Sequence, residues 1–179
     1  MKRILILGSG GSGKSTLASA LGEALNIRVV HLDAVYWNRG WQPTERARFI
    51  EKLRPLLAAE EWIIEGNYSG TLDLRLERAD TVVFLDLPRW LCLYRVVKRR
   101  IAYRGRSRPD MAEGCREKLD PDFVKWVWRY PKDKRPEMLK KLQKCRGEKT
   151  VIHLKSRRQV KRFMKTVRQA HRTHGSALC

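Results

Sequence analysis

The first residues suited to chemistry form a glycine-rich segment near the start of the chain, GSGGSGKST. It consists of Gly8, Ser9, Gly10, Gly11, Ser12, Gly13, Lys14, Ser15 and Thr16. The segment fits two phosphate-binding patterns, G-x-G-x-x-G of dinucleotide-binding folds and G-x-x-x-x-G-K-S of proteins that bind nucleoside triphosphates. In both, a glycine-rich turn presents backbone N–H groups to an anion at the start of a helix.

Lys14 and Ser15 distinguish the two patterns. A dinucleotide pyrophosphate needs no lysine at this place, whereas a lysine reaches the β and γ oxygens of a triphosphate and a serine hydroxyl ligates Mg²⁺. Asp33 does not distinguish the two patterns, because the dinucleotide pattern also has an acid about 20 residues further on. We therefore predict that the segment binds ATP with Mg²⁺ and that Lys14 is catalytic, with hydride transfer as the weaker alternative.

A strand before this segment and a helix after it are needed to position it. The run RILIL is typical of a buried strand over residues 3–8, and Leu17, Leu21 and Leu25 have helical spacing. Further strands are predicted at 28–34, 62–67, 81–88 and 149–156, with helices at about 44–60, 89–103 and 120–131 and a basic helix that ends near His171. Strands that alternate with helices form a mostly parallel sheet.

Acidic residues stand at the ends of three of these predicted strands. They are Asp33, Glu65 and Asp86. Ligands of open parallel sheets bind at the carboxyl ends of the strands. We therefore expect the glycine-rich segment and the three carboxylates to meet at one edge of the sheet.

The charge of the 179-residue chain is unevenly distributed. Residues 1–88 carry 11 Lys and Arg against 11 Asp and Glu, whereas residues 89–179 carry 28 against 8, so the second half accounts for the net charge of +20. Such an imbalance indicates a polyanionic ligand, either nucleic acid or a small molecule such as ATP.

Other features of the sequence indicate where the protein acts and how its domain is organised. The longest apolar runs fall short of the roughly 18 residues that span a membrane, and the N-terminal run is too short for a signal peptide. The four cysteines lack metal-ligand spacing, so a cytoplasmic protein with free thiols is expected. We predict one domain over residues 1–172, a lid insertion at about 104–122 where glycine, proline and charge are frequent, and a frayed tail at 173–179.

Several segments together resemble the DNA-topology-modulation family, whose members are small P-loop proteins related to adenylate kinase. The segments are GSGGSGKST, HLD, WIIEGNY, FLDLPRWLCLYRVVKRR and RPDMAEGC, and the resemblance extends from residue 1 to about residue 165. It implies a P-loop NTPase fold of the α/β class, with a five-stranded parallel sheet in the order 2-3-1-4-5, helices on both faces and a small lid. The family name describes a cellular phenotype and establishes no biochemical activity.

The resemblance also implies roles for individual residues. RVVKRR resembles the arginine helix of adenylate kinases, which implies Arg95 near the adenine and Arg99 on a phosphate as a catalytic cation. IIEGN resembles the end of their third strand, which implies that Glu65 holds Mg²⁺ through water beside Ser15; Asp86 is a weaker alternative. Asp33 resembles the acid with which small-molecule P-loop kinases orient an acceptor hydroxyl, although aspartate is also common in turns.

One departure from adenylate kinases concerns the acceptor. Those enzymes follow the glycine after the third strand with Phe-Pro-Arg, whose arginine grips the monophosphate, whereas this chain has Asn67-Tyr68-Ser69. Arg75 could substitute for that arginine. AMP is therefore expected to be a poor acceptor.

Two further groups of residues are candidates for the site. We expect arginines of the lid to close over the γ-phosphate and stabilise the charge of the transition state; they are Arg104, Arg106 and Arg108. The aromatic residues after Asp33 either stack on the acceptor or pack under a helix; they are Tyr36, Trp37 and Trp41. Trp126 and Trp128 are expected in the core, and the histidines are assigned no role.

The sequence thus predicts an ATP-dependent phosphotransferase of the adenylate-kinase-like class. It would move the γ-phosphate to a nucleotide or a small hydroxyl acceptor, and simple ATP hydrolysis stays open. The alternative is a nucleic-acid-binding P-loop NTPase that affects DNA topology and binds nucleic acid without sequence specificity through the basic second half. Against it, the sequence lacks a recognisable DNA- or RNA-binding motif. No membrane partner is expected.

Overall fold

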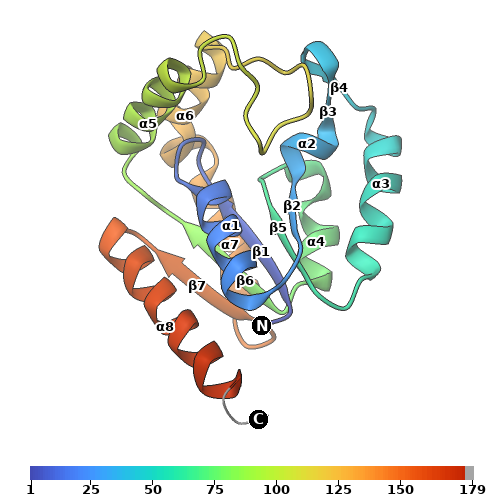
Figure 1. Ribbon diagram of the computed structural model, residues 1–179, viewed down its shortest axis with the longest axis vertical. Coiled ribbons are helices and arrows are strands. Elements are labelled where there is room, and N and C mark those ends of the chain that lie inside the picture. The colour runs from blue at the N-terminus through green and yellow to red at the C-terminus, as the bar shows by residue number, and fades with distance from the viewer. Residues whose placement is uncertain (176–179) are drawn as a thin grey trace.

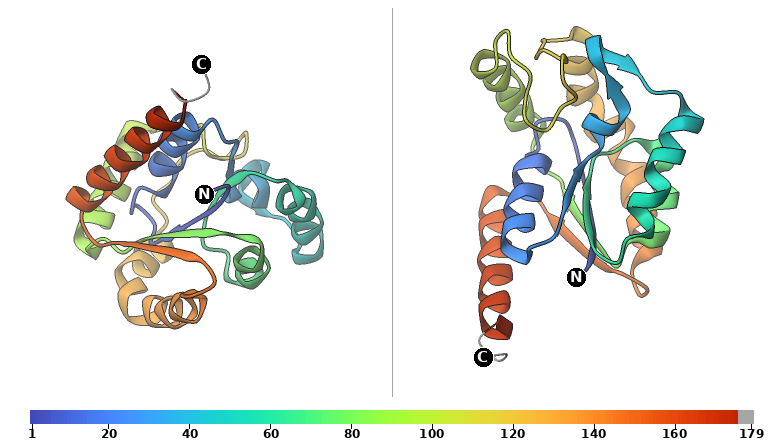
Figure 2. Two further views of the ribbon diagram at one scale, coloured as in Figure 1. Left: turned by 90° about the horizontal axis from the view of Figure 1, so that it is seen from below. Right: turned by 45° about the vertical axis from the view of Figure 1, so that its right-hand side comes forward.

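The computed structural model describes the backbone of residues 1–175 and the side chains of residues 1–171. At its centre lies a parallel five-stranded sheet with helices on both faces (Figure 1, Figure 2). The strands stand in the order β2 (Val29–His31), β5 (Trp62–Glu65), β1 (Arg3–Gly8), β6 (Thr81–Leu85) and β7 (Thr150–Leu154). Counted along the chain within this sheet, the order is 2-3-1-4-5, which confirms the predicted fold class.

Apolar residues at successive positions make the middle of the sheet. In β1, Leu5 and Leu7 face one layer of helices and Ile4 and Ile6 face the other, and all four side chains are fully buried. Side chains alternate across a strand, so a strand that helices cover on both sides has to be apolar throughout. Each of these side chains contributes about 1.5–3 kcal/mol to stability.

Two layers of helices cover the sheet. Helices α1 (Lys14–Leu25) and α8 (Arg157–Gly175) lie on one face, and α3 (Arg46–Ala58), α4 (Leu72–Arg78) and α7 (Arg135–Cys145) lie on the other (Figure 2). Helices α5 (Arg89–Ala102) and α6 (Pro121–Asp133) pack on each other beyond the carboxyl ends of the strands (Figure 1). Their contact buries Cys92, Val96 and Val127 together with Leu87.

The segment after β2 departs from the prediction. The strand expected at 28–34 ends at His31, and α2 (Leu32–Tyr36) follows it, so that Asp33 lies in the first turn of a short helix. A hairpin of β3 (Trp37–Asn38) and β4 (Gln42–Pro43) comes next, around the 3₁₀ turn η1 (Arg39–Trp41). Helix α4 was not predicted, because its seven residues are too few to display a clear helical period.

Residues 104–122 lack regular elements until α6 begins, apart from two isolated bridges that join Arg104 to Glu117 and Ser107 to Arg116. The segment, which we call the lid, arches over the carboxyl ends of the strands (Figure 1). The indole Nε1 of Trp41 donates a hydrogen bond to the carbonyl of Arg116 at 2.9 Å. The lid is therefore tied to the β3–β4 hairpin.

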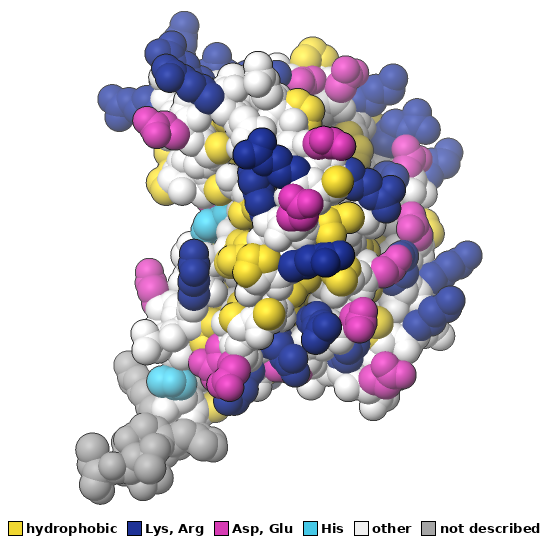
Figure 3. All heavy atoms as spheres, turned by 90° about the vertical axis from the view of Figure 1, so that its right-hand side faces the viewer, with side chains coloured by type: hydrophobic (Ala, Val, Ile, Leu, Met, Phe, Trp, Pro, Cys, Tyr) yellow, Lys and Arg dark blue, Asp and Glu magenta, His cyan; other side chains and the backbone are white. Residues whose placement is uncertain are grey.

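The C-terminal segment and the surface complete the description. Helix α8 continues to Gly175, and the rest of the predicted tail, residues 176–179, lies outside the described residues. None of the helices within residues 1–175 combines the length and apolar character that crossing a bilayer requires. Figure 3 views the side that carries α3, where Lys and Arg side chains are interspersed with Asp and Glu. That mixture fits the balanced charge of residues 1–88.

Candidate active site

A cavity of about 1250 Å³ opens between the carboxyl ends of the strands, α5 and the lid. It is lined by most of the residues that the sequence singles out: Gly10 to Thr16, Asp33, Glu65, Arg95 and Arg99. Gly8, which ends β1, and Ser9, which follows it, do not line the cavity. The predicted convergence at one edge of the sheet therefore exists for the glycine-rich loop, Asp33 and Glu65, with the lid as its cover, whereas Asp86 lies outside the lining.

The glycine-rich loop needs glycine for its path. Gly11 has a φ of +72°, and a Cβ there would lie 2.2 Å from the carbonyl oxygen of Cys92. Helix α1 begins at Lys14, and no side chain of the described residues caps its first turn. The hydroxyls of Ser9 and Ser12 are buried and find no hydrogen-bond partner in the described part of the chain. Such donors around a helix N-terminus suit an anionic ligand.

Lys14, Ser15 and Glu65 meet at the mouth of this loop. The ammonium of Lys14 donates to the carbonyl of Ser9 at 3.1 Å, and the Ser15 hydroxyl donates to Glu65 Oε1 at 3.0 Å. Burial alone raises the pKa of Glu65, but the hydrogen bond with His31 and the charge of Lys14 outweigh it and hold that pKa below its usual value. Glu65 is therefore a carboxylate beside a hydroxyl, the oxygen chemistry that Mg²⁺ prefers.

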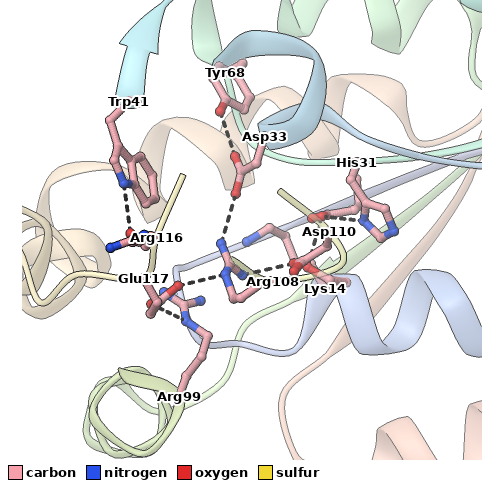
Figure 4. Close-up of polar contacts among 12 residues, drawn as sticks. Lys14, His31, Asp33, Trp41, Tyr68, Arg99, Arg108, Asp110, Arg116 and Glu117 are labelled. Atoms are coloured by element: carbon pink, nitrogen blue, oxygen red, sulfur yellow. Dashed lines mark hydrogen bonds and ion pairs between the residues drawn. The ribbon is translucent and has the colours of Figure 1, made fainter. Parts of the chain in front are cut away.

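Asp33 lies across the cavity from the loop. Its Oδ1 accepts a hydrogen bond of 2.6 Å from the Tyr68 hydroxyl, and its Oδ2 lies 3.9 Å from the guanidinium of Arg108 (Figure 4). Partial desolvation in the cavity raises the pKa of Asp33 although 39% of its side chain is exposed, and the nearby charge of Glu65 adds to that shift. The raised pKa makes Asp33 a stronger base than an exposed aspartate.

The two arginines of α5 have different surroundings. The Arg95 guanidinium lies against the glycine-rich loop and donates to the carbonyl of Ser12 at 2.9 Å. Arg99 pairs instead with the lid, its Nε lying 2.8 Å from Glu117 Oε1 (Figure 4). Arg99 thus lines the cavity, but its partner in this structure is a carboxylate that the sequence did not single out, and its predicted contact with a phosphate stays a prediction.

Arg108 is the lid arginine that enters the cavity, whereas Arg104 and Arg106 are exposed and lie outside its lining. The Arg108 side chain is 9% exposed and pairs with Asp110 at 2.9 Å and with Glu117 at 2.8 Å. Glu117 therefore holds Arg99 and Arg108 together (Figure 4). The charged residues of the lid that line the cavity are Arg108, Lys118, Asp110, Glu117, Asp120 and Asp122.

The suggestion that Arg75 grips an acceptor is wrong. Its side chain is fully buried, and its guanidinium donates to the backbone carbonyls of Gly66, Asn67, Tyr68 and Thr71. Burial lowers its pKa to about 9. Arg75 fixes the loop after β5 and cannot reach a ligand in the cavity.

Other expectations also change. Asp86 pairs with Arg135 at 2.8 Å and with His153 at 2.8 Å, outside the cavity lining, so it has a structural role at the end of β6. Trp128 is not in the core, because it is 47% exposed under the guanidinium of Arg89. Trp37 and Trp41 line the cavity, whereas Tyr36 packs against Phe49.

Sequence reasoning missed His31 and Asp110, in addition to Glu117 and Tyr68. The Nδ1 atom of His31 lies 3.0 Å from Glu65 Oε1, and Asp110 from the lid lies beside both (Figure 4). His31 ends β2, so the rule that selected Asp33 could have selected it too. Asp110 lies in irregular chain, where no periodic signal places a side chain.

Comparisons with known proteins agree with this architecture. The chain is 32% identical over 133 residues to the uncharacterized protein YqaC of Bacillus subtilis (strain 168), which covers 72% of each chain. No model of a known protein family matches.

Solved structures of kinases share the fold. A shikimate kinase from Acinetobacter baumannii in complex with shikimate has a TM-score of 0.59 and 16% identity, and the match covers 97% of this chain and 94% of that one. The shikimate kinase from Bacteroides thetaiotaomicron has a TM-score of 0.53 and 19% identity, and the match covers 94% of this chain and 97% of that one. The chain therefore has the fold of P-loop kinases, while the name of its relative gives no support to a role in DNA topology.

Proposed function

This chain belongs to the family of Bacillus subtilis YqaC, and on that premise we propose that it is an ATP-dependent kinase that phosphorylates a small hydroxyl compound. The observation that carries the proposal is the placement of Lys14 and Asp33 in one cavity beneath Arg108. A phosphate-binding cation and a carboxylate base then face each other across a space that the lid covers.

The donor end of the cavity suits the phosphates of ATP. The N–H groups at the start of α1 and the ammonium of Lys14 would bind the β- and γ-phosphates. The unpartnered hydroxyls of Ser9 and Ser12 would gain acceptors there. Arg95, which already lies against the loop, adds a further positive charge near the nucleotide.

The residues present also fit Mg²⁺. The Ser15 hydroxyl and the Glu65 carboxylate are oxygen donors that already touch each other, and they would hold the ion directly or through water. When bound, Mg²⁺ would neutralise charge on the phosphates.

Asp33 would act at the acceptor end. It would accept a hydrogen bond from the acceptor hydroxyl and orient it toward the γ-phosphorus, while the Tyr68 hydroxyl fixes the rotamer of the carboxylate. A bond then forms between the acceptor oxygen and the γ-phosphorus, the bond from that phosphorus to the β,γ-bridging oxygen breaks, and ADP leaves. The hydroxyl proton passes to Asp33. Such transfers depend mainly on positioning and on neutralising charge, and Arg108 and Arg99 would supply that charge when the transferred phosphoryl group replaces Glu117 as their partner.

The charges at this end favour a small alcohol over a nucleoside monophosphate. Arg75 is buried against backbone carbonyls, and Arg108 is already paired with Asp110 and Glu117. Lys14, whose charge acts on Asp33, would be engaged by the phosphates of ATP, so a second anionic group would meet carboxylates instead. Trp37 and Trp41 offer apolar faces to an uncharged ring or chain.

Two substitutions separate the roles at the two ends. Lys14→Ala should weaken ATP binding in calorimetry and abolish turnover, whereas Asp33→Asn should keep ATP binding and lose transfer. Glu23→Gln removes an exposed carboxylate of α1 and serves as the control. Wild-type turnover by Lys14→Ala with normal circular dichroism would refute the proposal.

The nucleic-acid alternative keeps the charge of the second half in its favour. The resemblance to the DNA-topology-modulation family is compatible with kinase activity, since its name describes a phenotype. We therefore retain nucleic-acid binding as a prediction to be tested separately.

A further inference from the structure

Three side chains with metal-binding atoms meet at the floor of the cavity. They are His31 at the end of β2, Glu65 at the end of β5 and Asp110 in the lid. One ligand atom from each lies within 4.8 Å of the other two. Two of the three side chains are thus fixed by the sheet, while the third arrives with the lid.

The spacing of these atoms suits a coordination shell. Ligand atoms lie about 2.0–2.2 Å from a first-row metal ion, so neighbouring ligands are about 3–4 Å apart. His31 Nδ1 and Glu65 Oε1 are 3.0 Å apart, and the Ser15 hydroxyl lies at the same distance from that oxygen. An ion placed among them would need a shift of Asp110 of about 1 Å or less.

The three side chains are largely buried, so their negative charge favours binding of a cation. The side chains of His31, Asp110 and Glu65 are 19%, 15% and 3% exposed. With both carboxylates ionised, and with the Nδ1 proton of His31 released to solvent as the ion binds, the group carries a charge of −2. Arg108 neutralises part of it through Asp110, and the charge of Lys14 acts on Glu65.

The imidazole determines which ions fit. Mg²⁺ prefers an octahedron of oxygens and retains its water, whereas imidazole suits first-row transition ions, whose affinities rise from Mn²⁺ through Co²⁺. A set of one nitrogen and two carboxylates therefore favours a transition ion over Mg²⁺.

We propose that His31, Glu65 and Asp110 form a binding site for a divalent first-row transition ion, which fastens the lid to the edge of the sheet. The ion binds without nucleotide, so the site does not depend on the proposed kinase activity. Asp110 is the contact through which the ion holds the lid, and Arg108 follows it because the two side chains are paired. The ion thus draws Arg108 toward the position that it occupies over Asp33.

Co²⁺ is the probe of choice, because its visible absorption reports bound ligands. Titrated into nucleotide-free protein, it should give a saturable spectrum with one ion per chain, and an excess of Mg²⁺ should not displace it. Asp110→Asn and His31→Gln should each weaken binding at least about tenfold. The controls are Glu113→Gln, an exposed carboxylate of the lid, and His171→Gln, an exposed histidine of α8; both should bind Co²⁺ like the wild type.

A second readout follows the lid itself. Trypsin can cut at Arg104 and Arg106, which are exposed, and bound Co²⁺ should slow these cuts in the wild type but not in Asp110→Asn. This variant lies in irregular chain and leaves the sheet intact, so the test does not depend on His31→Gln folding. The proposal is overturned if Co²⁺ gives no saturable spectrum, if both site variants bind it as the wild type does, or if His171→Gln abolishes binding.

Discussion

Asp33 and Asp86 are two aspartates near strand ends whose pKa values shift in opposite directions. Asp33 is partly desolvated in the cavity and has Glu65 nearby, and both raise its pKa. Burial also acts to raise the pKa of Asp86, but the hydrogen bonds from Arg135 and His153 outweigh it and lower that pKa. One residue is thus kept in a state useful for proton transfer, whereas the other is stabilised as a structural anion. Replacing each aspartate with asparagine should therefore change the melting temperature in opposite directions.

Asp33→Asn should stabilise the fold at neutral pH. A carboxyl with a raised folded-state pKa opposes folding once pH exceeds its unfolded value, near 3.8. The melting temperatures of the variant and the wild type should therefore agree near pH 4 and diverge as pH rises through the raised pKa, with the variant higher. A variant that melts lower by the same interval from pH 5 to 8 would contradict this assignment.

Asp86→Asn should have the opposite effect. The lowered pKa means that the carboxylate stabilises the fold above its unfolded value, also near 3.8, and that this contribution disappears as pH falls through the folded-state pKa. Thermal denaturation at pH 7 should show a lower melting temperature for the variant, and the difference should shrink toward pH 3. Phosphotransfer at a permissive temperature should persist, and its loss would place Asp86 in the catalytic machinery.

At the scale of elements, Glu117 connects the lid to α5. It is 3% exposed and pairs with Arg99 and Arg108 at 2.8 Å each. Glu117→Gln removes the charge from both ion pairs, and the charged hydrogen bond from Arg99 alone contributes about 1.5–3 kcal/mol. The lid should therefore open more often, and trypsin should cut at Arg104 and Arg106 about tenfold faster or more. Glu113→Gln is the matched control, and equal cleavage of the two variants would show that Glu117 does not hold the lid.

The sequence predicted the elements that burial determines. Uninterrupted apolar runs such as Ile4 to Leu7 indicate strands covered on both faces, and the glycine-rich segment requires a strand before it and a helix after it. The short helices α2 and α4 were not predicted because they hold too few residues for a period to appear, and the 11-residue helix α7 was not predicted either. The position of Asp33 at the edge of the sheet was foreseen, although it lies in a helix and not in a strand.

Contacts made by irregular chain could not be predicted. Arg108, Asp110 and Glu117 meet the cavity because the lid folds back over it, and nothing in residues 104–122 has a period from which that path follows. The role of Arg75 was misjudged for a related reason. Its charge suggested a ligand, but the loop after β5 turns its carbonyls inward, and Arg75 donates to them.

At the scale of the whole molecule, the positive charge of residues 89–179 is the feature that the kinase proposal uses least. The start of α8 borders the cavity through Arg157 and Lys161. Other cations of this helix, Arg158, Arg162 and Lys165, are exposed and lie outside the cavity lining. They could neutralise the phosphates of a nucleic acid.

Reversing the charge of Arg158, Arg162 and Lys165 should leave ATP affinity nearly unchanged, because the phosphates of ATP bind at the glycine-rich loop. Binding of duplex DNA should weaken, and in the wild type it should fall steeply with salt, with a logarithmic slope of about −0.9 for each phosphate contacted. Fluorescence anisotropy of labelled DNA at about 50–200 mM salt, the range over which such binding is lost, measures the DNA affinity and its salt dependence. DNA affinity that is absent at low salt would end the nucleic-acid alternative, and a parallel loss of ATP binding would assign these cations to the active site.

The fate of the γ-phosphate is the most direct test of the central claim. ATP labelled at the γ-phosphate is incubated with the protein, Mg²⁺ and a panel of uncharged alcohols, sugars, nucleosides and AMP, and the products are separated. We predict label in one phosphorylated small hydroxyl compound for the wild type, little in ADP made from AMP, and none in any acceptor for Asp33→Asn, which still binds ATP. Label that passes efficiently to AMP, or transfer by Asp33→Asn at the wild-type rate, would contradict the account.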